Sequence, residues 1–100
     1  MNPLWDAAKS GNIEMLQTII DNGANLDVQD DTGRLRYTPL MWAIDRGHVE
    51  CVRLLINAKA DLEITGVYDN EYTALILAVE CNQVECVRLL INARANLEAR

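Results

Sequence analysis

The chain has 100 residues, of which half are hydrophobic and 24% are charged, and its formal net charge is −6 at neutral pH. This length and composition fit one globular domain with a modest core. The acidic balance argues against nucleic acid or an anionic membrane as partner, because both attract a basic surface. No apolar run approaches the roughly 18 residues that a membrane-spanning helix needs.

The start of the chain and its cysteines favour a cytoplasmic protein. Residues 1–6 lack the basic region followed by an apolar region that marks a secretory signal. Cys51, Cys81 and Cys86 are an odd number of cysteines, and two of them lie inside a repeated apolar segment. We therefore expect small, buried thiols in a reducing compartment rather than a disulfide framework.

One segment of ten residues occurs twice in the chain. Residues 49–58 reappear letter for letter as residues 84–93, at a spacing of 35, and a period of this length is typical of a repeat protein. The segment is amphipathic at helical spacing but apolar over most of its circumference. A helix of this kind has to be covered on several sides, so the sequence predicts a stack of helices.

The first unit contains two short predicted helices joined by a glycine. Asn2, followed by proline, is a suitable N-cap for a helix over about residues 3–10. Gly11 then allows a left-handed turn. A second helix is predicted over about residues 13–22, and Gly23 ends it.

The second and third units repeat this pattern, with Thr38 and Thr73 as the N-cap residues. Gly11 and Gly47 occupy the turn in the first two units, and Asn82 occupies it in the third. Asparagine tolerates the left-handed region better than most residues, which supports the alignment. The predicted helices of these two units are, in order, 39–46, 49–58, 74–81 and 84–93.

The segments between units, 24–37 and 60–72, are too long for simple turns and contain alternating apolar residues. We predict that they are extended fingers, folded back at Gly33 and near residues 69–70. The short helices are marginal alone, so they must pack within their unit and against the next one. No linker divides the chain, which predicts a single domain over residues 1–100. The predicted repeats are about 2–29, 30–65 and 66–100.

This pattern resembles the ankyrin repeat, a unit of about 33 residues with a turn, two helices and a Thr-Pro-Leu-His-x-Ala signature. Residues 38–43 read Thr-Pro-Leu-Met-Trp-Ala, and residues 2–7 and 73–78 are looser versions. Gly-His-Val at 47–49 and Ala-Asp-Leu at 60–62 resemble later landmarks of the family. The resemblance implies an all-α solenoid of three ankyrin-like helix-turn-helix repeats with extended β-turn or hairpin fingers.

The chain departs from the family pattern in three respects. Successive units are 36 and 35 residues apart, and the excess lies in the finger tips. The signature histidine is missing from all three units. The family's glycine after the second helix remains as Gly23 but is replaced by Lys59 and Arg94 in the later units. A lysine at that position predicts backbone strain if the left-handed turn is kept.

The residue pattern predicts neither catalysis nor a cofactor. His48 is the only histidine, so a multi-histidine metal site is excluded, and we interpret it as a polar residue before a helix. Cys81 and Cys86 lack the C-x-x-C spacing of a zinc site. The carboxylates form no evident acid–base pair, and there is no Gly-rich phosphate loop. A dyad of His48 with Cys51 is the one catalytic arrangement left open, and Cys51 lies among core positions.

The function should therefore lie in a surface. The resemblance implies that another protein binds to the finger tips and to the exposed face of the first helices. Tyrosine and arginine often carry interface energy, and Tyr37 and Tyr72 should lie side by side, either in the site or as braces for the fingers. Trp5 and Trp42 are interpreted as packing residues. The predicted partner-binding residues are Arg34, Leu35, Arg36, Tyr37, Asp45, Arg46, Tyr68, Asp69, Glu71, Tyr72 and Glu80.

We predict a protein–protein interaction module with no nucleic-acid or membrane partner. Two alternatives remain open: a stoichiometric inhibitor of a partner enzyme, and a structural part of a longer repeat array. The first unit has Thr18 where the later units have Leu54 and Leu89, whereas the third unit has no such polar change. Because a terminal repeat needs a polar outer face, we expect self-association through the C-terminal repeat, near Leu89.

Overall fold

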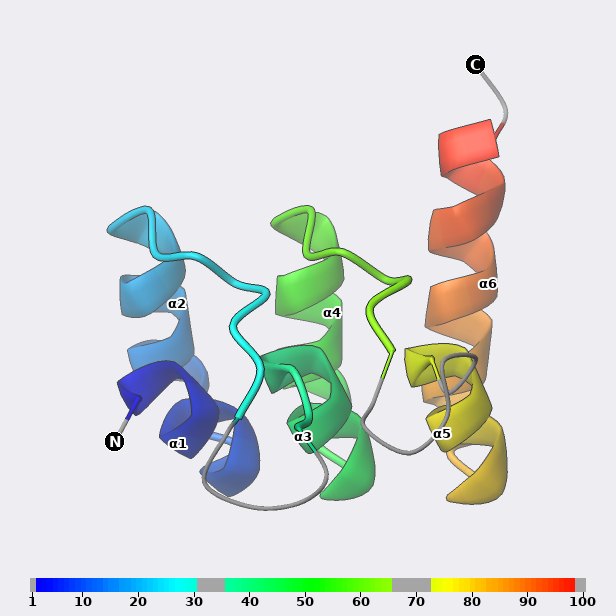
Figure 1. Cartoon of the computed structure of the whole chain (residues 1–100), viewed down its shortest axis with the longest axis horizontal. Helices are drawn as coiled ribbons and strands as arrows, with labels where there is room; N and C mark the ends of the chain where they lie inside the picture. Colours follow the sequence, from blue (N-terminus) through cyan, green and yellow to red (C-terminus); the bar gives the residue numbers. More distant parts are fainter. Residues whose placement is uncertain (1, 31–35, 66–72, 99–100) are drawn as a thin grey trace.

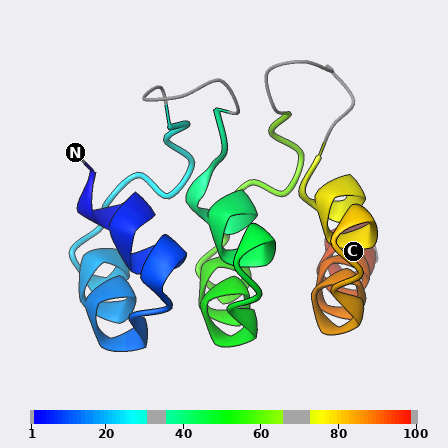
Figure 2. The same cartoon turned by 90° about the horizontal axis from the view of Figure 1, so that it is seen from below.

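The computed structural model describes residues 2–30, 36–65 and 73–98, with side chains up to Arg94 (Figure 1). This part of the chain contains six helices and no strand. The helices form three pairs, which stand side by side in chain order (Figures 1 and 2). The helices are α1 (Pro3–Ser10), α2 (Ile13–Asp21), α3 (Pro39–Asp45), α4 (Val49–Asn57), α5 (Ala74–Glu80) and α6 (Val84–Glu98).

The first helix of each pair begins at the predicted polar residue. The side chain of Asn2 accepts a hydrogen bond from a backbone N–H of α1, Thr38 does so for α3 and Thr73 for α5. A cap of this kind contributes about 1 kcal/mol to helix stability. Asn12 caps α2 in the same way, whereas His48 precedes α4 without a side-chain cap. Local sequence therefore sets where these helices begin.

The turn inside each repeat has the predicted left-handed backbone. The φ angles are 74° at Gly11, 74° at Gly47 and 57° at Asn82. The same region is used where the second helices of the first two repeats end, with φ of 79° at Gly23 and 71° at Lys59. Lys59 thus keeps the glycine conformation despite its β-carbon, which is a strained arrangement.

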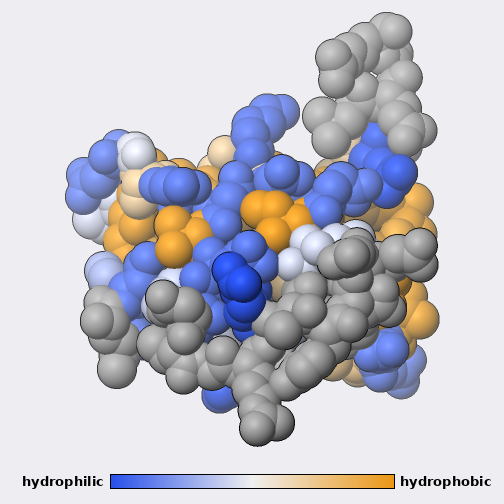
Figure 3. Space-filling model, viewed as in Figure 1, coloured by the Kyte–Doolittle hydropathy of each residue, from blue (hydrophilic) through white to orange (hydrophobic). Residues whose placement is uncertain are grey.

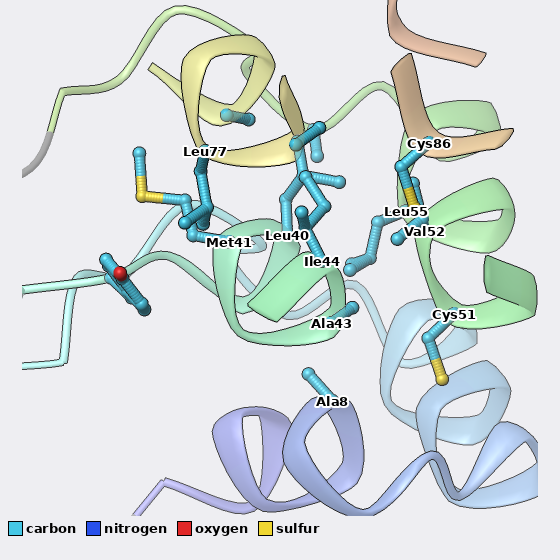
Figure 4. Packing of buried hydrophobic residues seen from close by; sticks show 14 of the residues in the cluster. Ala8, Leu40, Met41, Ala43, Ile44, Cys51, Val52, Leu55, Leu77 and Cys86 are labelled. Atoms are coloured by element: carbon cyan, nitrogen blue, oxygen red, sulfur yellow. The ribbon is translucent and has the colours of Figure 1, made fainter. Parts of the chain in front are cut away.

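The core runs without interruption through the three repeats. Each helix contributes buried side chains, and many of the largest come from the middle repeat: Leu40, Met41, Ile44, Val52 and Leu55. Ala8 of α1 points towards Ala43 of α3, and Leu77 of α5 lies against Met41 (Figure 4). The middle repeat is therefore covered on both sides by its neighbours, whereas each end repeat is covered on one side.

A second contact joins each repeat to the one before it at the turns. His48 lies over Gly11, where a β-carbon would come within 2.7 Å of its Nδ1, and its Nε2–H donates to the carbonyl oxygen of Lys9 at 3.0 Å. Gln83 lies over Gly47 in the same way, with 3.1 Å between its Nε2 and a β-carbon there. These two glycines are needed both for the left-handed backbone and for the close approach of the next repeat.

Helix α6 is longer than the sequence pattern predicts. Five of the six helices end within one residue of their predicted ends, but α6 continues past Arg94 to Glu98. The turn that follows α2 is held by the turn that follows α4, because Asp27 Oδ1 accepts a hydrogen bond from the backbone N–H of Asp61 at 2.8 Å. At the equivalent place after the second repeat, Glu63 forms an ion pair with Arg94. Helix continuation satisfies the backbone groups of α6 without a neighbour.

The predicted fingers are described only at their bases. The backbone N–H of Asp30 donates to the carbonyl oxygen of Tyr37 at 2.8 Å, which joins the two sides of the first finger. The expected reversals at Gly33 and near residues 69–70 lie outside the described residues.

Lys59→Gly should raise the free energy of unfolding by up to about 1 kcal/mol, because glycine has no steric cost at positive φ. The gain is reduced by the greater freedom that glycine gives the unfolded chain. Urea or thermal unfolding measures the difference. The matched control is the reverse change at the equivalent position, Gly23→Ala, which should cost about 1 kcal/mol. A clear loss of stability in Lys59→Gly would contradict the assigned strain.

Gly11→Ala should cost about 2 kcal/mol or more, which exceeds the cost of Gly23→Ala. At Gly11 a β-carbon meets the His48 ring, whereas at Gly23 it meets nothing within 4 Å. In the double variant Gly11→Ala/His48→Ala the steric part should vanish. A double-mutant cycle by chemical unfolding measures this coupling, and strictly additive losses would show that the contact has no energetic weight.

Candidate functional site

A cluster of charged and aromatic side chains joins the base of the first finger to the first helices of repeats one and two. We call it the cation–aromatic cluster, and its members are Lys9, Asp30, Tyr37, Trp42 and Arg46. Lys9 comes from α1, Trp42 from α3, and Arg46 is the residue that ends α3. Asp30 and Tyr37 are the two finger residues joined by the backbone hydrogen bond.

Asp30 is the buried anchor of the cluster, with only 2% of its surface exposed. Its Oδ2 accepts from the indole Nε1–H of Trp42 at 3.1 Å and lies 3.4 Å from the ammonium of Lys9. A buried carboxylate needs such partners, because an unpaired buried charge is costly. Asp30 therefore fixes the position of an aromatic ring and a cation at once.

Trp42 presents its ring to two cations. The ammonium of Lys9 lies 4.3 Å from the ring centroid, and the guanidinium carbon of Arg46 lies 5.5 Å from it. Both distances are within the range of a cation–π contact, which is worth about 0.5–1 kcal/mol at an exposed site. Tyr37 meets the same ring edge-on, with 5.0 Å between the centroids and 71° between the planes. The cluster is thus a rigid aromatic platform with positive charge on it.

Arg36 stands next to the cluster with an unusual backbone. Its φ is 51°, which is the left-handed region, and the residue is exposed. Its carbonyl oxygen accepts from the side-chain amide of Gln29 at 3.1 Å, and the same amide nitrogen donates to the carbonyl oxygen of Thr65 at 2.9 Å. Gln29 thereby joins the residues just before α3 to Thr65 in the segment after α4. Strained non-glycine residues occur often at functional sites, and Arg36 is held in this conformation by its surroundings.

The predicted site residues differ in their exposure in the structure. Tyr37 is buried, with 6% of its surface exposed, so its ring braces the finger and is not open to direct contact. Arg46 and Asp45 are exposed at the end of α3 and form an ion pair at 3.5 Å. Glu80 is exposed at the end of α5. Arg34, Leu35, Tyr68, Asp69, Glu71 and Tyr72 lie outside the described residues.

Sequence reasoning missed the residues that organise this cluster. From the sequence, Trp42 is interpreted only as a packing residue, and Asp30 receives no role. Trp42 is half-buried and contacts charged groups, whereas Trp5 is buried and its Nε1–H donates to the Val28 carbonyl oxygen at 2.8 Å. The two tryptophans are offset by one position in the aligned repeats, and that offset was the available signal that their roles differ.

The cysteines are free thiols, and their surroundings do not activate them. Cys51 and Cys86 are buried and Cys81 is half-buried. Burial raises the pKa of all three thiols, and nearby carboxylates raise it further: Glu50 at Cys51, Asp45 and Glu80 at Cys81, and Glu85 at Cys86. A raised pKa is the opposite of what a nucleophilic cysteine needs. His48, the only histidine, directs its Nε2 to Lys9 rather than to a thiol.

An open groove of about 700 Å³ lies between the turn after α4 and the second half of α6. Its apolar lining includes Ile56, Leu62 and Leu89. The ion pair of Glu63 with Arg94 joins its two sides. Helix α6 extends alongside the turn that follows α4, and this extension forms one wall of the groove. Helix α4 is shorter and ends at Asn57.

The comparisons with known proteins agree with this architecture. The family model for ankyrin repeats in three copies matches residues 4–100, so the chain belongs to the ankyrin-repeat family. Acyl-CoA-binding domain-containing protein 2 of Arabidopsis thaliana is 41% identical over 54 residues, which are 54% of this chain and 14% of that protein. Ankyrin repeat domain-containing protein 29 of Danio rerio is 39% identical over 63% of this chain and 20% of its own length.

Osteoclast-stimulating factor 1 of Gallus gallus is 38% identical over 63% of this chain and 29% of its own length. The matched region thus spans less than a third of each of these three relatives. Ankyrin repeats are in general protein-interaction modules. No helix within residues 2–30, 36–65 and 73–98 is long and apolar enough to cross a membrane.

Asp30→Ala should lower the free energy of unfolding by about 2 kcal/mol, because it leaves the Trp42 indole N–H without its acceptor and Lys9 without its counter-ion. Asp30→Asn should cost less, since the amide oxygen can still accept from Trp42. Chemical unfolding followed by tryptophan fluorescence measures both. The control is Asp21→Ala, an exposed position where a change within about 0.5 kcal/mol is expected. Equal effects at positions 21 and 30 would contradict the anchoring role.

Proposed function

We propose that this chain binds a partner protein through the finger bases and the exposed ends of the first helices. The observation that carries the proposal is the cation–aromatic cluster, in which buried Asp30 positions Trp42 and Lys9 on the face that the family resemblance implies for binding. Tryptophan and arginine are among the residues that most often dominate interface energy. Side chains held in place before binding also lose little entropy on complex formation.

The proposed contact surface extends from this cluster along the stack. Arg36 and Arg46 supply exposed positive charge in the second repeat, where Asp45 forms an ion pair with Arg46, and Glu80 supplies negative charge in the third repeat. Tyr37 acts from below the surface as a brace. The finger residues proposed from the sequence alone are Arg34, Leu35, Tyr68, Asp69, Glu71 and Tyr72. A partner that fits this surface carries the opposite sequence of charges.

We further propose that this protein is cytoplasmic, that it is not an enzyme, and that it binds neither nucleic acid nor a membrane. The raised thiol pKa values and the engagement of His48 with Lys9 support a non-catalytic role. The net charge of −6 opposes attraction to nucleic acid or to an anionic membrane. The first alternative, an inhibitor of a partner enzyme, would use the same surface. The second alternative is part of a longer repeat array, and it agrees with the small fraction of each relative's length that the chain matches.

The test is a pull-down with the wild-type chain followed by affinity measurement with the variant Arg36→Ala/Arg46→Ala. Tyr37 is left unchanged in this variant, because it is buried and its loss would alter stability as well as binding. Binding should weaken by about 2 kcal/mol or more, with a nearly unchanged melting temperature.

The matched control is Arg53→Ala/Arg88→Ala, which removes the same charge from the exposed i,i+3 ion pairs on α4 and α6. Full binding by the Arg36/Arg46 variant, or an equal loss in the control, would overturn the proposed surface. A recovered enzyme whose activity falls in the complex would identify an inhibitor, and recovery of further repeats would identify part of a longer array. Self-association through the C-terminal repeat is a separate proposal, because it uses the end of the stack.

A further inference from the structure

Among the described residues, exposed large hydrophobic side chains are confined to the first and third repeats. Among the described residues none belongs to the middle repeat. Two lie on α2 at the N-terminal end, Ile13 and Met15, and four lie on α5 and α6 at the C-terminal end, Ile76, Val79, Val84 and Ile91. Figure 3 shows hydrophobic surface along the right-hand edge, where the third repeat stands.

The C-terminal face is the continuation of an interface that is already formed twice inside the chain. Val79 aligns with Ile44 and Ala8, which are both fully buried, yet 60% of its surface is exposed. Ile76 is likewise exposed, although it aligns with Met41, against which Leu77 of the next repeat lies (Figure 4). The residues that receive the following repeat in units one and two are therefore present, apolar and uncovered in unit three.

The expectation that this surface centres on Leu89 needs correction. Leu89 is half-buried against the core, whereas Ile91 on the same helix is 52% exposed. The identical helix of the middle repeat packs Leu54 partly against the same core. Ile91 aligns with Ile56, which lines the groove on the side of α6, so Ile91 belongs to the C-terminal face. Val84 aligns with Ile13, which is exposed in the first repeat as well, so its exposure does not distinguish this end of the stack.

The N-terminal face is not suited to cover this surface. Asp6 aligns with Trp42 and Leu77, and both of these contact the preceding repeat, as the Lys9–Trp42 contact and the Leu77–Met41 contact show. A second copy that docked its first repeat here would bring the Asp6 carboxylate against Ile76 and its neighbours. Burying an unpaired carboxylate on an apolar surface is strongly unfavourable.

We propose that two copies of this chain pair through their C-terminal faces, so that α5 and α6 of one copy cover α5 and α6 of the other. An interface of this kind is isologous: the same patch is used by both copies, and association stops at the dimer. Apolar residues then meet apolar residues, and no Asp6 carboxylate is buried. The cation–aromatic cluster lies between repeats one and two, so this dimer does not rest on the proposed partner binding.

The test is analytical ultracentrifugation of the 100-residue chain from about 5 µM to about 1 mM, concentrations that bracket a weak-to-moderate dimer. We expect a monomer–dimer equilibrium with no larger species. Higher salt should strengthen the dimer, because each copy carries a net charge of −6 and salt screens the repulsion.

Val79→Lys should raise the dimer dissociation constant at least about tenfold, because it places an ammonium in the apolar contact. The matched control is Met15→Lys, which should leave the dissociation constant unchanged. Met15 is an exposed apolar residue of the first repeat and aligns with Cys51, which is buried and points from α4 towards the preceding repeat (Figure 4). Circular dichroism confirms that each variant is folded. Val79→Ala, with no added charge, should weaken the dimer less, which keeps the test valid if the lysine variant does not fold.

A mixture of the two lysine variants separates the two possible orientations. In a head-to-tail contact, Val79→Lys still offers a sound N-terminal face and Met15→Lys a sound C-terminal face, so the mixture would form a heterodimer. In the isologous dimer only Met15→Lys associates, and only with itself. A strict monomer at about 1 mM, polymers beyond the dimer, or rescue in the mixture would each overturn the proposal.

Discussion

None of the six described helices buries its apolar surface within its own repeat alone, and each therefore depends on the repeat beside it. The helices of the first two repeats have between 7 and 9 residues, a length at which isolated helices are marginal in water. Stability comes from stacking, because each first helix packs on the first helix of the next repeat and each second helix on the next second helix. The glycine turns belong to the same constraint, since His48 and Gln83 reach the preceding repeat only because Gly11 and Gly47 lack a β-carbon.

The same stacking produces the candidate site. In the segment that follows α2, Asp30 is buried between a lysine of repeat one and a tryptophan of repeat two. The cluster exists only where two repeats meet, because neither repeat supplies both partners. Its position on a rigid stack, rather than on a free loop, makes it suitable for recognition with little loss of entropy on binding. Gln29 extends this support to the segment after α4 through the carbonyl oxygen of Thr65.

The two ends of the stack differ in the polarity of the residues that would face a further repeat. At the N-terminal end the positions that would face a preceding repeat include Asp6 and Thr18, where the second and third repeats have hydrophobic residues. At the C-terminal end Ile76 and Val79 retain the character of inner positions, although no repeat covers them in the structure. Since uncovered apolar surface is unfavourable in water, the C-terminal end is the one where association gains most.

Much of the fold was predictable from local sequence. The caps Asn2, Thr38 and Thr73 mark the first helix of each repeat, and the left-handed turns occur at the expected glycines and at Asn82, because these effects act within a few residues of chain. The duplicated segment identified the repeat and, through it, the ankyrin-like solenoid. The candidate site was predictable only in part, since the position of Arg46 follows from the repeat whereas its contact with Trp42 does not.

The sequence by itself determined where helices begin, where the chain turns and how many repeats there are. Tertiary structure decided what each position faces. Residues 49–57 and 84–92 are identical, yet α4 ends at Asn57 and α6 continues to Glu98, because the turn after α4 lies against a neighbouring repeat. Val79 is exposed whereas Ile44, at the aligned position, is buried, because a following repeat covers Ile44 and none covers Val79 in the structure. Burial, helix extension and the pairing of Asp30 with Trp42 all depend on the neighbouring repeat, which no local pattern of residues contains.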